Sequence, residues 1–172
     1  MAIDLPRLDL RDALDLAILI EEEAKQRYEE FTHVVGGRYP GDAADVFRTM
    51  ALNEAKHRDE LTARRRQLFG DTPSRVSLDQ LDDVEAPDRG KPRVFMSARE
   101  AMQVAIASEE KARDFFEDAA RRVDDVDVRR LFEELRREEV QHRAWLTERI
   151  ERLPPGPDLE EDEADEPGSD PG

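Results

Sequence analysis

Two Glu-x-x-His motifs, Glu54–His57 and Glu139–His142, each lie inside a stretch with helical periodicity. Residues three apart on a helix share a face, so the carboxylate and the imidazole of each motif point to one place. In each half of the chain an earlier helical stretch carries a further glutamate on its apolar face, Glu21 or Glu109. Four carboxylates and two imidazoles suit a pair of iron or manganese ions held inside a helix bundle.

The two halves of the chain repeat one pattern. The residues from Glu21 to Tyr28 match those from Glu109 to Phe116, with a shared alanine three positions after the glutamate, and the two Glu-x-x-His motifs match each other. We therefore expect a duplicated helical hairpin whose copies pack about a pseudo-two-fold axis. The expected metal ligands are the terminal glutamates Glu21 and Glu109, the bridging glutamates Glu54 and Glu139, and the histidines His57 and His142.

Such a centre has a definite chemistry. Two metal ions can take up or release two electrons together, so an O–O bond can be reduced without releasing a radical. The alternative is a set of salt-bridged surface helices without metal. That alternative is disfavoured because burying four carboxylates without cations costs many kcal/mol.

Composition narrows the class of protein. Charged residues make up 41% and aromatic residues 6% of the chain, and cysteine is absent. This composition favours a mostly helical fold and excludes disulfides, thiolate zinc sites and rubredoxin-type iron. The net charge of −16 argues against nucleic acid as a partner. The longest apolar run, Leu16–Ile20, is too short to span a bilayer, so we expect a cytoplasmic protein without a membrane partner.

The periodic stretches predict helices over about 8–34, 43–68, 97–123 and 128–153. Asp42 and Ser97 are candidate N-caps, and Glu100 completes a capping box with Ser97. The connection over 69–97 is long enough to cross the length of a bundle; the alternative is a linker between two separate hairpins. We expect one four-helix domain over 8–153 and a disordered acidic tail over 154–172.

These motifs resemble the rubrerythrin-type branch of the ferritin-like superfamily over about residues 10–150. The resemblance implies an all-α, ferritin-like antiparallel four-helix bundle with a long crossover between helices 2 and 3. It also implies a non-haem di-iron site that oxidises Fe(II) with O2 or peroxide, in a homo-oligomer. Rubrerythrins often carry a rubredoxin domain, so a peroxidase of this kind would need a separate electron donor. They also tend to have a second glutamate where this chain has Ala112, which makes the expected site more symmetric and favours ferroxidase-type chemistry.

Some assignments stay open at this stage. Tyr28, two turns after Glu21, is expected either to support catalysis by hydrogen-bonding a ligand carboxylate or to pack with its hydroxyl at the bundle edge. Glu138 competes with Glu139 for the metal site, and the parallel with Glu54 favours Glu139. The functional alternatives are an iron-storage or carrier subunit without turnover and a plain helical interaction protein.

Overall fold

Four long helices form the fold in the computed structural model, which describes residues 3–77 and 84–153. They are α1 (Leu10–Val35), α2 (Ala43–Phe69), α3 (Ala98–Arg122) and α4 (Val126–Arg152), preceded by a single 3-10 turn, η1 (Leu5–Arg7). The predicted all-α class is confirmed. None of the helices within the described ranges combines the length and the apolar character that a membrane crossing requires.

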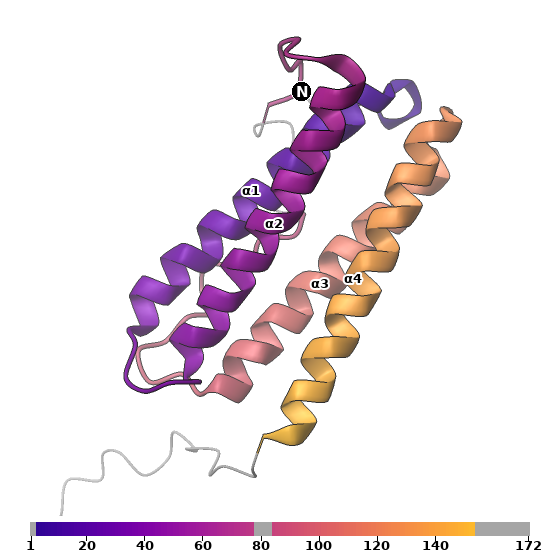
Figure 1. Cartoon of the computed structure of the whole chain (residues 1–172). Coiled ribbons are helices and arrows are strands. Elements are labelled where there is room, and N and C mark those ends of the chain that lie inside the picture. The colour runs from indigo at the N-terminus through magenta and orange to yellow at the C-terminus, as the bar shows by residue number, and fades with distance from the viewer. Residues whose placement is uncertain (1–2, 78–83, 154–172) are drawn as a thin grey trace, which may run out of the picture.

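The helices are arranged as two antiparallel hairpins, α1–α2 and α3–α4, packed side by side (Figure 1). The chain leaves α2 at one end of the bundle and starts α3 at the other end, so α2 and α3 run in the same direction. Between the hairpins, α2 contacts α3 and α1 contacts α4. The predicted crossover is therefore confirmed, and the alternative of two separate hairpins is wrong.

Each helix begins at a side-chain cap. Asp9, Asp42, Ser97 and Asp125 accept hydrogen bonds from backbone N–H groups in the first turn of the helix that follows, and Glu100 completes the predicted capping box at Ser97. The cap at Asp125 explains why α4 begins two residues earlier than its apolar pattern indicates. The tail expected to be disordered, 154–172, lies outside the described residues.

A buried ion pair ties the beginning of α1 to the end of α2. The Arg65 guanidinium donates to both carboxylate oxygens of Asp15, at 2.8 and 3.2 Å. It also donates to the carbonyl oxygens of Gly70 and Thr72 in the turn after α2. Both charged groups are buried, so each depends on the other for its countercharge.

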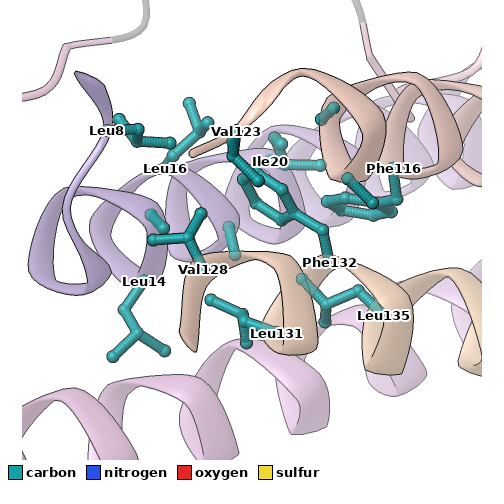
Figure 2. Packing of buried hydrophobic residues seen from close by; sticks show 14 of the residues in the cluster. Leu8, Leu14, Leu16, Ile20, Phe116, Val123, Val128, Leu131, Phe132 and Leu135 are labelled. Atoms are coloured by element: carbon teal, nitrogen blue, oxygen red, sulfur yellow. The ribbon is translucent and has the colours of Figure 1, made fainter. Parts of the chain in front are cut away.

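Two apolar clusters fill the bundle interior, one toward each end. The first lies where α1 and α4 begin and α3 ends, and Figure 2 shows its aromatic and aliphatic side chains interleaved. Its members include Leu14, Leu16, Ile20, Phe116, Val123, Leu131, Phe132 and Leu135. The second cluster lies toward the other end and includes Tyr28, Phe31, Phe47, Met50, Met102 and Leu146.

The glutamates of the predicted site separate these clusters. On α1, Glu21 lies between Ile20 of the first cluster and Tyr28 of the second. The other helices repeat this order around Glu54, Glu109 and Glu139. A layer of carboxylates therefore divides the core in the middle of the bundle.

Candidate metal centre

Two Glu-Glu-His clusters lie in this middle layer. In the first, ligand atoms of Glu21, Glu54 and His57 all lie within 4.8 Å of one another. His57 Nδ1 is 3.8 Å from Glu21 Oε2 and 3.6 Å from Glu54 Oε2. These side chains come from α1 and α2, so one hairpin supplies the whole cluster.

The second cluster repeats the first in the other hairpin. Ligand atoms of Glu109, Glu139 and His142 also lie within 4.8 Å of one another. His142 Nδ1 is 3.2 Å from Glu109 Oε2 and 3.5 Å from Glu139 Oε2. The His57 and His142 rings stack with their centroids 4.6 Å apart, so the two clusters adjoin and form one centre.

Burial distinguishes the carboxylates of this centre from surface ion pairs. The four glutamates are at most 1% exposed. Several of their oxygen atoms, including both of Glu54, have no hydrogen-bond partner among the described residues. A buried polar atom without a partner is costly. Divalent or trivalent cations would satisfy these oxygens, and the donor set of carboxylates and imidazoles fits iron or manganese.

In the metal-free site, neighbouring carboxylates compete for protons. Burial raises the pKa of Glu21 and of Glu109 well above the usual range, and the neighbouring glutamates raise both further. Burial also acts on Glu139, but hydrogen bonds from His142 and Glu109 outweigh it and lower the pKa of Glu139. The protons therefore distribute unevenly over the cluster, and bound cations would replace them.

A seventh side chain, Glu85, enters the site from the crossover and was not predicted. Glu85 is 1% exposed, and one of its carboxylate oxygens lies within 4.8 Å of ligand atoms of Glu21 and Glu139. It thereby meets one glutamate from each hairpin. Burial and the nearby Glu54 and Glu139 carboxylates raise the pKa of Glu85 well above the usual range.

Side chains from two helices hold the crossover at this position. The Ser108 hydroxyl of α3 donates to the carbonyl oxygen of Glu85. Lys111 Nζ, also on α3, donates to the Ala86 carbonyl at 2.7 Å, and Arg27 Nη1 of α1 donates to the Pro87 carbonyl at 2.8 Å. Three consecutive carbonyl groups are therefore fixed to the bundle.

The two residues left open by the sequence are also placed by the structure. Glu139 is buried in the second cluster, whereas Glu138 is half-buried beside it and outside the close-contact groups. Tyr28 is fully buried and stacks on Phe47, so its hydroxyl does not lie at the bundle edge. That hydroxyl lies near the Ser108 side chain, but it makes no well-aligned hydrogen bond to a described residue. Burial raises the pKa of Tyr28 well above its usual range, and the Glu109 and Glu54 carboxylates raise it further. The nearby Ser108 side chain lowers this pKa slightly.

Solvent reaches the centre from its histidine side. The His57 and His142 side chains are 15% and 25% exposed, whereas the glutamates are nearly inaccessible. A shallow pocket lies next to His57 and is lined in part by Leu61, Leu135 and Glu138. The histidines come from α2 and α4, while the crossover is held by α1 and α3. The imidazoles are therefore the most solvent-accessible of the six expected ligands.

Comparisons with known proteins agree with this arrangement. A structure of an uncharacterized conserved protein from Magnetospirillum magnetotacticum MS-1 is similar, with 29% identity, a TM-score of 0.65, and coverage of 86% of this chain and 97% of that one. A hypothetical protein from Pyrococcus furiosus shares the fold at 17% identity, with a TM-score of 0.53 and coverage of 87% and 95%. No curated protein matches the chain. The family model described as Rubrerythrin matches residues 12–89 and 100–169, and the chain belongs to the rubrerythrin family.

Proposed function

We propose that the chain binds two iron ions between its hairpins and oxidises Fe(II) with O2 or hydrogen peroxide. The observation that carries this proposal is the pair of adjoining Glu-Glu-His clusters, whose buried carboxylate oxygens lack partners. Membership of the rubrerythrin family supports it. A bound pair of Fe(II) ions would supply two electrons that, with two protons from solvent, reduce one molecule of hydrogen peroxide to two of water and leave two Fe(III) ions.

The side chains have distinct roles in this proposal. Glu21 with His57, and Glu109 with His142, would each hold one ion, while Glu54 and Glu139 would be shared between the two. The glutamates are buried, and the two apolar clusters on either side hold their helices in place. Manganese has the same preference for these donors, so the identity of the metal is part of the test.

Reduction of peroxide over many turnovers also requires electrons from outside this chain. The absence of cysteine leaves the chain without a rubredoxin-type iron site of its own. We therefore propose a separate electron donor for peroxide turnover. Oxidation of Fe(II) supplied as substrate requires no such donor, because each ion brings its own electron.

Anaerobic titration with Fe(II), followed by mixing with O2 or peroxide, tests the proposal. We expect two ions per chain and rapid oxidation that can be followed by absorbance. Glu139→Gln should lose binding of the pair, whereas Glu138→Gln, its half-buried neighbour, should bind as the unaltered chain does. Binding of two ions without oxidation would point instead to a storage or carrier subunit. Equal binding by both variants would contradict the site itself.

A further inference from the structure

The crossover between α2 and α3 carries a buried carboxylate that the six expected ligands do not include. Glu85 lies at the centre of the bundle, although the described residues that follow it, up to residue 97, include no helix. One of its carboxylate oxygens, Oε2, has no hydrogen-bond partner among the described residues. A buried acidic group that lies among other buried acidic groups is unfavourable in the metal-free protein, and Lys111 Nζ, which donates to the Ala86 carbonyl, is a nearby base that partly offsets this.

Hydrogen bonds to the backbone of residues 85–87 hold the Glu85 side chain at the site. The carbonyl groups of Glu85, Ala86 and Pro87 all accept hydrogen bonds from side chains of the bundle. Val84 and Ala86, the neighbours of Glu85, are buried as well. The segment is therefore packed into the bundle, and the position of the carboxylate follows from its backbone.

The position of Ala112 on α3, where rubrerythrins tend to have a second glutamate, also bears on the role of Glu85. The family resemblance predicts a second glutamate at the position of Ala112, which here is fully buried and apolar. Ser108, one turn before Ala112 on the same face of α3, donates to the Glu85 carbonyl. The crossover is thus fixed to α3 beside this position through its backbone, while its carboxylate lies with Glu21 and Glu139.

We propose that Glu85 is a fifth carboxylate ligand of the metal pair, supplied by the crossover beside Glu21 and Glu139. This inference rests on the proposed function, because it presupposes that the centre binds metal. Glu85 meets the terminal ligand of the first cluster and the shared ligand of the second, so it adds a donor to the ion held by Glu21 and His57. The two metal positions are therefore inequivalent, in contrast to the symmetric site expected from the sequence.

Two consequences follow from a fifth carboxylate. Four carboxylates balance the charge of two divalent ions, so the additional negative charge favours ions in the trivalent state. Metal binding also joins the crossover to all four helices through one centre. The amide groups of residues 84–90 should therefore exchange with solvent more slowly when metal is bound.

Binding of Mn(II) to the full chain and to Glu85→Gln tests the proposal without relying on activity. The matched control is Glu30→Gln, which removes an exposed ion pair between α1 and Arg89 of the crossover but no donor of the site. We expect Glu85→Gln to weaken at least one of the two Mn(II) affinities by about 10–100-fold in calorimetric titration. Glu30→Gln should bind both ions with unchanged affinity.

Thermal unfolding and hydrogen exchange separate a ligand from a structural residue. Without metal, Glu85→Gln should melt at a higher temperature than the unaltered chain, because a buried carboxyl group crowded by other carboxylates is replaced by a group that cannot ionise. With Mn(II), it should gain less stability, and residues 84–90 should not acquire the protection seen in the unaltered chain and in Glu30→Gln. Wild-type affinity and protection in Glu85→Gln would overturn this inference alone. Failure of the unaltered chain to bind Mn(II) or Fe(II) would overturn the proposed function as well.

Discussion

The imidazole rings of His57 and His142 stack face to face, with their centroids 4.6 Å apart and their planes inclined by 4°. The two residues occupy equivalent positions in the two halves of the repeat. Each ring nitrogen Nδ1 lies within 4 Å of two glutamate oxygens of its own hairpin. The stack is therefore a junction between two half-sites, and each half-site has a histidine of its own that can be altered separately.

Removal of one imidazole should affect one metal position. We expect His57→Ala and His142→Ala each to weaken the binding of one ion by about 10–100-fold and to leave the other bound. Calorimetric titration with Mn(II) and elemental analysis of the loaded protein measure this. His33→Ala is the matched control, since His33 is exposed near the end of α1. Two ions bound by His57→Ala with unchanged affinity would contradict the assignment.

The Tyr28 hydroxyl offers a test of whether this residue serves packing or chemistry. Phe116 occupies the equivalent position in the repeat, so the interior accommodates a ring without a hydroxyl there. Because the buried hydroxyl lacks a partner, Tyr28→Phe should stabilise the metal-free protein by about 1 kcal/mol in denaturant unfolding. If Tyr28 supports catalysis, the same variant should bind two ions but oxidise Fe(II) more slowly. An unchanged oxidation rate would assign Tyr28 to packing alone.

The response to pH should differ between the metal-free and metal-loaded protein. Burial raises the pKa of Glu21 and Glu109, so the folded state binds more protons than the unfolded state above about pH 4.3. For these groups the free energy of unfolding is highest below that pH and falls as the pH rises through their folded-state pKa values. Bound cations compete with the protons and should bind more tightly as the pH rises.

Melting temperatures at about pH 5.5 and about pH 7.5 test this expectation. The gain in melting temperature on adding Mn(II) should be larger at the higher pH. The capping carboxylate of Asp42 does not interfere, because backbone N–H groups outweigh its burial and hold its pKa below the usual range. A gain that is equal at both pH values would mean that protons and metal do not compete for these glutamates.

The buried pair between Asp15 and Arg65 should be the most sensitive ion pair of the fold. Asp15→Asn leaves the Arg65 guanidinium buried without a countercharge and should cost about 3 kcal/mol of unfolding free energy. The exposed pair between Arg64 and Glu134 is the matched control, and Glu134→Gln should cost at most about 1 kcal/mol. Denaturant unfolding without metal measures both. Equal losses of unfolding free energy in the two variants would show that burial does not determine how much these ion pairs contribute to stability.

The sequence predicted most of the fold because its helices carry local signals. The apolar periodicity and the caps at Asp42 and Ser97 depend on neighbouring residues only, so they can be read without tertiary information. The repeat indicated which residues gather in the middle of the bundle, since it distinguished Glu139 from Glu138 by analogy with Glu54; their role as ligands stays a prediction. The structure places the six expected residues in the two clusters.

Glu85 was not predicted from the sequence, and the reason is physical. It lies outside the helices, where no periodicity indicates which side chains face inward, and its burial depends on contacts with distant residues such as Ser108 and Arg27. A weak local signal exists, since Val84 and Ala86 make its neighbourhood apolar. Ala112 led to the expectation of a symmetric site, because the helices alone supply the same three expected ligands, two glutamates and one histidine, from each hairpin.

The division of the core by a glutamate layer also bears on the order in which this protein folds and acquires metal. Each end of the bundle has its own apolar cluster, so the helices can associate before any cation is present. The proposed ligands would then meet a metal ion as a preformed site with fixed spacing, and not as a flexible chain that folds around the ion. Discrimination among metals would accordingly come from the geometry of the folded bundle. A site of carboxylates and imidazoles needs such geometric selection, because its affinities for divalent metals otherwise follow the Irving–Williams order.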